Sequence, residues 1–344
     1  MEKLRFGIVG TNFISDWVIT GGLEDERFEP VAVCSRSEQK AKAFAQKYRI
    51  PHLFTSLEEM AASPLIDAVY IASPNAFHAQ QSILCMQHGK HVLCEKAFAS
   101  NAREARLMIE TAKRQGVALM ETMNPAHQQG VVLMEAMKST LTPAFRAAID
   151  YLPQIGVPRR YFSCYCQYSS RYDKLKEGIV LNAFQPELSN GATMDIGVYT
   201  IYPMVALFGK PATIHATGTK LSSGVDGQAA VNFTYPNGMV ATVLYGKIAD
   251  STLPTEIQGE SGTIKLDRIN IISDVIFMNR KGESKTIRPE TIHNEYYYEI
   301  AEFIDIIQSG QKESIINSLT NSLITMEIMD EIRNQLGVCF PADG

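Results

Sequence analysis

The sequence predicts an α/β protein in two parts. Residues 1–121 are expected to form a Rossmann domain with a doubly wound parallel sheet, and residues 122–344 an α+β domain with a large, mainly antiparallel open sheet. Three observations favour this fold class. The chain has 344 residues, enough for two ordinary domains. Its first third alternates short apolar runs with amphipathic stretches of helical spacing, and its later part is rich in strand-like runs.

The alternation in the first third is typical of βαβ units. Short apolar runs predict strands at residues 4–9, 30–34, 68–72, 91–94 and 117–120. Amphipathic stretches predict helices at residues 39–48, 78–88 and 102–115. Strands without polar alternation are typical of a sheet buried on both faces, and right-handed crossovers then give a doubly wound domain.

The pattern changes near Glu121. A helix is predicted over residues 126–138, and a second helix is predicted to start after Pro143. Strand-like runs follow at residues 161–168, 212–220, 229–235, 239–246 and 263–266. Pro236-Asn237-Gly238 predicts a hairpin turn, because Asn and Gly accept positive φ, so the sheet should be largely antiparallel. Helices are predicted over residues 296–308 and 319–336.

Composition excludes several classes of protein. The net charge is −5 and there is no basic run, which argues against nucleic-acid binding. The six cysteines form no Cys-x-x-Cys pair and the seven histidines no His-x-x-x-His pair, so we expect no metal and buried free thiols. No apolar stretch reaches the ~18 residues of a membrane span, and no cleavable signal is evident. We therefore expect a cytoplasmic protein that binds neither membrane nor nucleic acid.

The end of the first predicted strand resembles a dinucleotide-binding turn. The usual fingerprint is G-x-G-x-x-G/A; here Gly10 fits its first position, Asn12 replaces the second glycine and Ser15 the third. Asn tolerates the left-handed conformation better than most residues, and the following helix N-terminus can hold a pyrophosphate. An ordinary β-turn-α explains the segment equally well. The residues expected to contact the cofactor here are Gly10, Thr11, Asn12, Phe13 and Ile14.

The second strand bears on the choice of cofactor. NAD-specific sites carry Asp or Glu at its end, whereas this chain has Ser35 and Arg36, with Lys40 in the next helix. Arg offers a planar fork suited to a phosphate. NADP(H) is therefore expected to be preferred over NAD(H), although a solvated Arg in a loop is the simpler alternative.

Further segments carry a resemblance to a known family. D-A-V-Y-I-A-S-P-N begins at Asp67 and is followed by His78; G-K-H-V-L-C-E-K ends at Lys96; N-G-A-T-M-D-I-G-V-Y ends at Tyr199. Together they resemble the glucose–fructose oxidoreductase/inositol dehydrogenase family, often written Gfo/Idh/MocA, and M-E-I-M-D-E-I from Met326 is also similar. The Tyr form of the third motif resembles the branch that holds dimeric dihydrodiol dehydrogenase.

The resemblance implies an NAD(P)-dependent oxidoreductase acting on CH–OH groups, with its active site between the domains. Hydride would pass between the nicotinamide and a sugar-, polyol- or diol-like carbonyl/hydroxyl substrate. Cofactor contacts would come from Ser73, Pro74, Asn75, His78, Glu95 and Lys96. The catalytic residues would be Lys96, Asp195 and Tyr199. The chain departs from the family pattern at Ala97, where the family has Pro, and at Asn12 and Ser15.

These residues suit carbonyl reduction, which needs a proton at oxygen as well as hydride at carbon. Asp195 and Tyr199 are four apart and share one helix face, which Tyr202 would extend. A tyrosine has an ordinary pKa near ~10, and a nearby ammonium such as that of Lys96 lowers it. We therefore expect Tyr199 to act as acid/base, Lys96 to tune it and Asp195 to anchor the substrate. The alternative is that the tyrosines are core aromatics.

Two other functions and several partners stay open. The chain could be a non-catalytic dinucleotide-binding regulator, or an NAD-dependent glycosidase of the same family. His78 could line the nicotinamide pocket or cap its helix. A small carbohydrate-like molecule is the expected substrate. The family's open sheet often dimerises, so a homodimer or higher homo-oligomer through the C-terminal sheet is expected, with residues 229–246 as candidates.

Overall fold

The computed structural model describes residues 2–118, 130–291 and 293–344. The chain divides into two compact units. The first unit is Met1–Lys138 with Ile292–Ser322, and the second unit is Ser139–Thr291 with Leu323–Gly344. The expected division falls between residues 121 and 122, which lie outside the described residues. The first unit instead extends to Lys138 and also includes a later segment, Ile292–Ser322.

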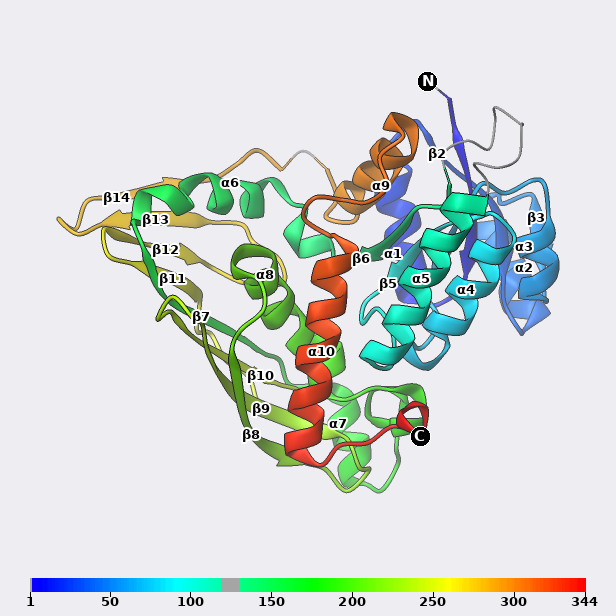
Figure 1. Ribbon diagram of the computed structural model, residues 1–344. Helices are drawn as coiled ribbons and strands as arrows, with labels where there is room; N and C mark the ends of the chain where they lie inside the picture. Colours follow the sequence, from blue (N-terminus) through cyan, green and yellow to red (C-terminus); the bar gives the residue numbers. More distant parts are fainter. Residues whose placement is uncertain (1, 119–129, 292) are drawn as a thin grey trace. The chain divides into compact units, whose positions relative to one another are not determined.

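The first unit contains the predicted parallel sheet. Its six strands have the order β3-β2-β1-β4-β5-β6, and every pairing between them is parallel (Figure 1). The strands are β1 (Leu4–Val9), β2 (Phe28–Cys34), β3 (His52–Phe54), β4 (Ala68–Ile71), β5 (His91–Glu95) and β6 (Leu133–Ala136). The strand order reverses between β1 and β4. In such sheets the ligand crevice lies at this reversal, outside the carboxyl ends of the strands.

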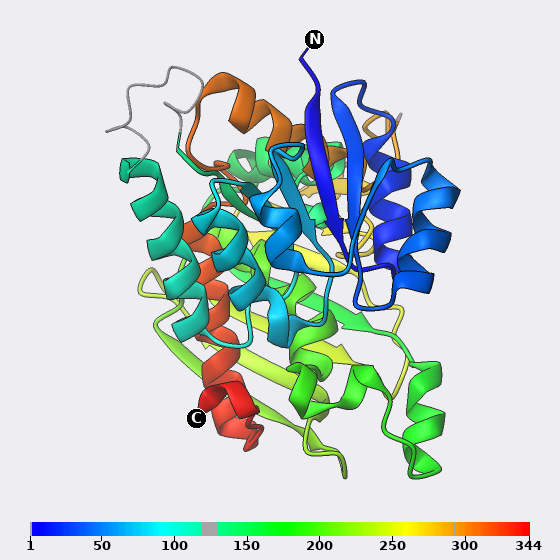
Figure 2. The same ribbon diagram turned by 90° about the vertical axis from the view of Figure 1, so that its right-hand side faces the viewer.

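Helices connect these strands and cover the sheet. They are α1 (Phe13–Gly22), α2 (Glu38–Tyr48), α3 (Leu57–Ala62), α4 (His78–Gln87), α5 (Ala102–Ala118) and α9 (Tyr297–Ser309). The dark blue α1 and α2 lie apart from the cyan α4 and α5, as a doubly wound sheet requires (Figure 2). The segment that returns late in the chain packs α9 against α1, so closely that a Cβ on Gly21 would lie 2.8 Å from Tyr296 Cβ.

Two predicted elements at the end of this unit are wrong. The helix predicted over residues 126–138 is instead strand β6 over Leu133–Ala136, paired in parallel with β5. The strand predicted over residues 117–120 is wrong at its start, because α5 continues through Ala118. Residues 119–129 lie outside the described residues. Periodicity does not distinguish a short buried strand from a buried helix, and here pairing with β5 decides.

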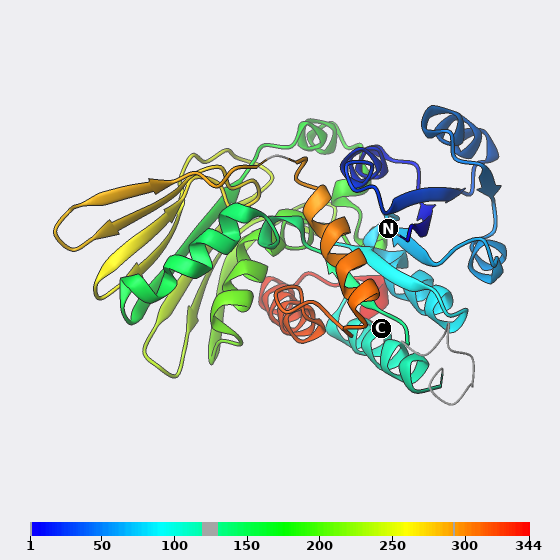
Figure 3. The same ribbon diagram turned by 90° about the horizontal axis from the view of Figure 1, so that it is seen from above.

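The second unit contains the predicted open sheet. Its eight strands have the order β14-β13-β12-β11-β7-β10-β9-β8, and the pairings are antiparallel except that of β7 with β10. The strands are β7 (Pro158–Cys166), β8 (Thr213–Lys220), β9 (Asp226–Thr234), β10 (Val240–Gly246), β11 (Thr255–Gly259), β12 (Gly262–Leu266), β13 (Val275–Asn279) and β14 (Ser284–Ile287). Seen from above, the yellow and gold strands fan out with the usual sheet twist (Figure 3).

One face of this sheet is covered by helix. The second unit contains α6 (Pro143–Tyr151), α7 (Ser170–Lys176) and α8 (Val198–Phe208), and α10 (Leu319–Leu336) leads into it. Tyr161 of β7 is buried, and its hydroxyl donates to Thr200 O of α8 at 3.0 Å. Burial alternates strictly along most of β9, so the opposite face of that strand is exposed. None of the described helices is both long and apolar enough to span a bilayer.

Candidate functional site

The turn after β1 has the backbone of a dinucleotide-binding turn at Gly10. Gly10 has φ +102°, and its N–H donates to Cys34 O at 3.0 Å. A Cβ there would lie 3.0 Å from Ala72 O, at the end of β4. Both the left-handed backbone and the tight contact require glycine. The turn thus lies at the reversal of strand order.

Asn12 fits this turn for a different reason from the one its sequence position indicates. Its φ is −93°, an extended conformation, so tolerance of the left-handed region is not used. The side chain caps α1: Ile14 N and Ser15 N donate to Asn12 Oδ1 at 2.8 and 3.2 Å. Its Nδ2 donates to Ala72 O at 2.7 Å. Asn12 therefore links the start of α1 to the end of β4 and occupies two of the first-turn N–H groups expected to hold a pyrophosphate.

The segment that follows β2 carries basic side chains and no acidic side chain at the position expected to bind the ribose. Arg36 and Lys40 are exposed and Ser35 is half-buried. Ser37 N donates to Ser35 Oγ at 3.3 Å, and Ser37 in turn caps α2. The Arg36 guanidinium carbon lies 5.7 Å from the centre of the Phe77 ring, in the loop after β4. The β2 and β4 loops thus meet at Arg36.

His78 joins the loops that follow β4 and β5. It is fully buried, with Nε2 at 2.8 Å from Ser73 O and Nδ1 at 2.8 Å from Ala97 O. Burial lowers the pKa of His78, and the hydrogen bonds to the Ala97 and Ser73 carbonyl groups oppose that shift. Of the two roles left open, lining a pocket and capping the helix, the structure favours neither: both ring nitrogens face backbone, and His78 positions the two loops. Its direct contact with a cofactor stays a prediction.

The remaining cofactor-side residues lie on the same edge of the sheet. Ser73 Oγ donates to Gln81 Oε1 at 2.7 Å, Pro74 is half-buried and Asn75 is buried. Glu95 is buried at the end of β5, where it accepts hydrogen bonds from Tyr70 OH and from Lys96 N.

Burial raises the pKa of Glu95, which Lys96 lowers in part. The carboxyl group of Glu95 lies inside the unit beside Tyr70, whereas Lys96 is half-buried. The Lys96–Ala97 peptide bond is cis and Ala97 is fully buried.

The second unit brings Asp195 and Tyr199 to one helical segment, as expected. Asp195 lies in a π-helix, Thr193–Gly197, that runs directly into α8. Asp195 and Tyr199 are half-exposed, whereas the residues between them are buried. The Tyr199 ring meets the Tyr165 ring edge-on, with centroids 5.7 Å apart. Tyr202 is fully buried, in agreement with the alternative that it is a core aromatic.

Lys247 is a site residue that the sequence analysis missed. Its buried ammonium donates to Asp195 Oδ2, and it lies 5.4 Å from the centre of the Phe184 ring. It follows β10 immediately, and its backbone N–H donates to Gly227 O at 2.8 Å. No motif marks a lone lysine after a strand, so only the partner carboxylate, 52 residues earlier in the chain, reveals it.

A buried carboxyl group supports the π-helix. Asp226 Oδ2 accepts hydrogen bonds from Thr193 N and Thr193 Oγ1, both at 2.7 Å. Thr193 Oγ1 also lies 2.7 Å from Tyr245 OH. Burial raises the pKa of Asp226, and Lys247 opposes that shift.

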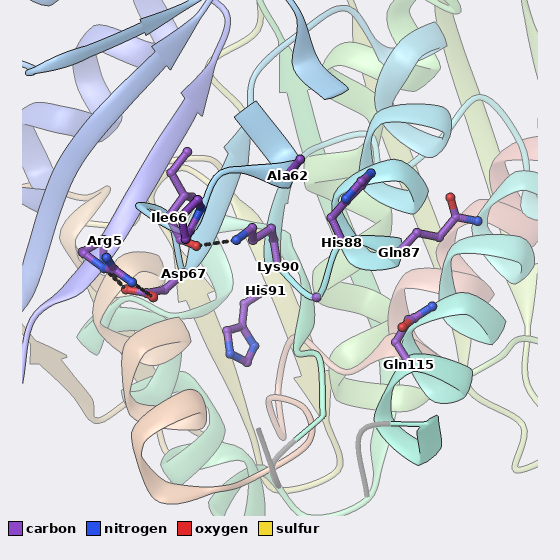
Figure 4. A pocket seen from close by; sticks show the side chains of 11 residues that line it. Arg5, Ala62, Ile66, Asp67, Gln87, His88, Lys90, His91 and Gln115 are labelled. Carbon is purple, nitrogen blue, oxygen red and sulfur yellow. Dashed lines mark hydrogen bonds and ion pairs between the residues drawn. The ribbon is translucent and has the colours of Figure 1, made fainter. Parts of the chain in front are cut away.

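A cavity of about 740 Å³ in the first unit lies at the other edge of the parallel sheet (Figure 4). It is lined by residues at the amino ends of β1, β4 and β5. Its charged side chains already have partners: Arg5 Nε and Nη2 donate to Asp67 at 2.8 and 2.6 Å. Lys90 Nζ donates to Ser63 O and Ile66 O, at 2.7 and 2.8 Å. This edge is opposite the one where dinucleotides bind. Among the described residues, no group of three or more His, Cys, Asp or Glu side chains is placed to hold a metal ion.

Two protein-family models match this chain, one over the segment that contains most of the parallel sheet and one over much of the open sheet. The family model described as "Oxidoreductase family, NAD-binding Rossmann fold" matches residues 4–123, and the "GFO/IDH/MocA C-terminal domain" matches residues 155–265. The scyllo-inositol 2-dehydrogenase (NADP(+)) IolU of Bacillus subtilis is 48% identical over 340 residues, covering 99% of each chain. Trans-1,2-dihydrobenzene-1,2-diol dehydrogenase of Mus musculus is 28% identical over 357 residues, again covering 99% of each chain.

Solved structures share the fold at lower identity. The aldose-aldose oxidoreductase of Caulobacter crescentus, complexed with glycerol, aligns with a TM-score of 0.84 at 19% identity, over 97% of both chains. A levoglucosan dehydrogenase in complex with NADH and levoglucosan aligns with a TM-score of 0.80 at 19% identity, over 98% of both chains. Together with the family models and the 48% identical relative, these matches confirm the resemblance found in the motifs. The chain belongs to the Gfo/Idh/MocA oxidoreductase family, with an NAD-binding Rossmann fold in its N-terminal part.

Proposed function

We propose that this protein is an NADP-preferring dehydrogenase of a cyclic polyol, with scyllo-inositol as the first candidate. The observation that carries the proposal is the turn at Gly10, at the reversal of strand order, beside an Arg36 loop that lacks an acid. The relative that is 48% identical is a scyllo-inositol 2-dehydrogenase that uses NADP(+), which supports both the substrate class and the cofactor.

The described residues fit a dinucleotide. Gly10 has a left-handed backbone and lies so close to Ala72 O that a Cβ would be strained there, and the segment from Thr11 to Ile14 starts a helix whose dipole favours a pyrophosphate. Ser35, Arg36 and Lys40 would hold the phosphate that distinguishes NADP from NAD. Ser73, Pro74, Asn75, His78, Glu95 and Lys96 would form or support the nicotinamide end. The bound cofactor supplies or accepts the hydride.

Side chains of the protein would transfer the proton to or from the substrate oxygen. In this proposal Tyr199 donates a proton to the substrate oxygen during reduction, or accepts it during oxidation. Asp195 accepts hydrogen bonds from substrate hydroxyls, and Lys96 favours the charged form of the acid/base group. The half-exposed Asp195 and Tyr199, flanked by buried residues, support these roles.

We also propose that the chain forms a homodimer through the second unit's sheet. The register places Phe162, Leu244 and Met278 on the face opposite Tyr161, and Met278 is 46% exposed. A Leu244→Glu/Met278→Glu variant should be a monomer by light scattering, while Ile315→Glu, at a site 87% exposed, should leave the dimer intact. A monomeric wild type would contradict the proposal.

The cysteines bear on the cellular compartment. All six are free thiols, and disulfides are rare in reducing compartments, so we propose that the protein is cytoplasmic.

The test of function is turnover of a substrate panel with each cofactor. Wild-type protein should oxidise scyllo-inositol with NADP⁺ faster than it oxidises aldoses or diols, and calorimetry should show tighter binding of NADPH than of NADH. Arg36→Asp should reverse that preference, because one charge-assisted hydrogen bond is worth roughly ten- to over a hundredfold in affinity. Arg49→Asp is the matched control: Arg49 is exposed at the other end of α2, in a left-handed conformation that Asp tolerates.

Two results would contradict the proposal. Equal affinity of the wild-type protein for NADPH and NADH would remove the NADP preference. Absence of turnover for every cyclitol, sugar and diol in the panel would remove the substrate class.

A further inference from the structure

The ion pair between Lys247 and Asp195 joins two side chains that differ in burial. The Lys247 side chain is 4% exposed, whereas the Asp195 side chain is 33% exposed. A buried ammonium is costly unless a charged partner compensates it. The protein therefore holds a lysine inside the second unit with its charge directed at a carboxylate that reaches the surface.

Both members of the pair are held by backbone. Lys247 follows β10 and is fixed by its N–H bond to Gly227 O. Asp195 lies in the π-helix, whose first turn is held by Asp226 through Thr193. Gly191, just before it, has φ +135°, and a Cβ there would collide with Asp226 Oδ1. Single π-helical turns occur frequently at functional sites.

We propose that Lys247 is a positioning residue of the substrate site. Its ammonium binds Asp195 Oδ2 and so fixes the plane of the carboxylate, which then accepts hydrogen bonds from substrate hydroxyls in one orientation. This inference rests on the proposed polyol dehydrogenase activity. It predicts that loss of Lys247 affects polyol binding and turnover, and that cofactor binding, which belongs to the first unit, is unchanged.

The first test compares Lys247→Met with wild type. Met keeps most of the buried volume and removes the charge. Loss of one charge-assisted contact should lower kcat/KM for scyllo-inositol by roughly ten- to a hundredfold, mainly through KM, while the Kd for NADPH stays within about twofold. Calorimetry of scyllo-inositol in the presence of NADPH should show the same loss in binding. Lys210→Met is the matched control, because Lys210 pairs with Glu327 at 2.6 Å in the same unit and is 59% exposed.

The second test distinguishes positioning from simple stability. Lys247→Ala leaves space for a small alkylammonium ion, so methylamine or ethylamine should restore part of kcat/KM to this variant and none to Lys210→Ala. The double variant Lys247→Met/Asp195→Asn should resemble Asp195→Asn alone, because residues that act as a unit are not additive. A lysine with only a structural role would lower the unfolding temperature without amine rescue and with additive kinetic effects.

The outcomes separate this inference from the proposed function. If the wild type oxidises no polyol, the proposed function fails and this inference falls with it. If the wild type is active and Lys247→Met retains kcat and KM within about threefold, only the role of Lys247 is overturned. Multiplicative effects of the two substitutions in the double variant would overturn it as well.

Discussion

Replacing Asn12 by Ala tests how this chain builds its dinucleotide turn without the second glycine. The substitution removes two kinds of contact. Asn12 Oδ1 accepts from Ile14 N and Ser15 N as the cap of α1, and Asn12 Nδ2 donates to Ala72 O at 2.7 Å. The first contact stabilises a helix end, and the second links α1 to the end of β4.

The expected loss can be estimated from these contacts. Replacing an N-cap Asn by Ala costs about 0.5–2 kcal/mol, and the bond to Ala72 O contributes about 0.5–1.5 kcal/mol more. We expect a total of about 1–3 kcal/mol, since the two terms overlap. In a unit of roughly 150–250 residues, each kcal/mol lowers Tm by roughly 2–4 °C. The Asn12→Ala protein should therefore unfold several degrees below wild type.

The assay is thermal unfolding of the cofactor-free protein, followed by titration with NADPH. Ser37→Ala is the matched control in the same unit, because the Ser37 side chain caps α2 through one bond from Lys40 N at 3.4 Å and is not linked to another strand. Its Tm should fall by less than half as much. If Asn12→Ala unfolds within about 1 °C of wild type and loses NADPH affinity, Asn12 is a direct cofactor contact and our structural argument is wrong.

Three further predictions concern catalysis, pH and the turn itself. Tyr199→Phe should lower kcat by ~10²–10⁴ with unchanged NADPH affinity, and Lys96→Met should give a similar, non-additive defect; near-normal turnover would assign the proton transfer to another group. Burial raises the pKa of Glu135 from 4.5 to about 8, so the folded state holds a proton that the unfolded state has released, and stability falls as pH rises from 4.5 to 8. Glu135→Gln should flatten the dependence of Tm on pH between pH 5 and 9, and parallel curves for the two proteins would contradict this. Gly10→Ala places a Cβ 3.0 Å from Ala72 O in a left-handed backbone and should weaken NADPH binding at least tenfold by calorimetry. Wild-type affinity in this variant would contradict the requirement for glycine at this position.

The sequence by itself predicted four strands of the parallel sheet and five of the open sheet, but not β3, β6, β11, β13 or β14. Period-two and period-3.6 patterns report which face of a strand or helix is buried, and these predicted both sheets. Gly10 was found because it fits the first position of a contiguous fingerprint, and the structure gives it the positive φ that favours glycine. The motifs ending at Lys96 and Tyr199 were sufficient for the family, since they are contiguous in the chain.

The tertiary structure decided what depends on pairing between distant residues. Residues 133–136 form β6 because β5 lies beside them, against their helical appearance. Asn12 is linked to β4 only because the fold brings Ala72 O, 60 residues away, to its side chain. Lys247 gains a role only because the path of the chain returns it to Asp195. Local patterns encode burial and backbone preference, whereas the partner of a buried charge is fixed by the route of the chain, and no short segment contains that information.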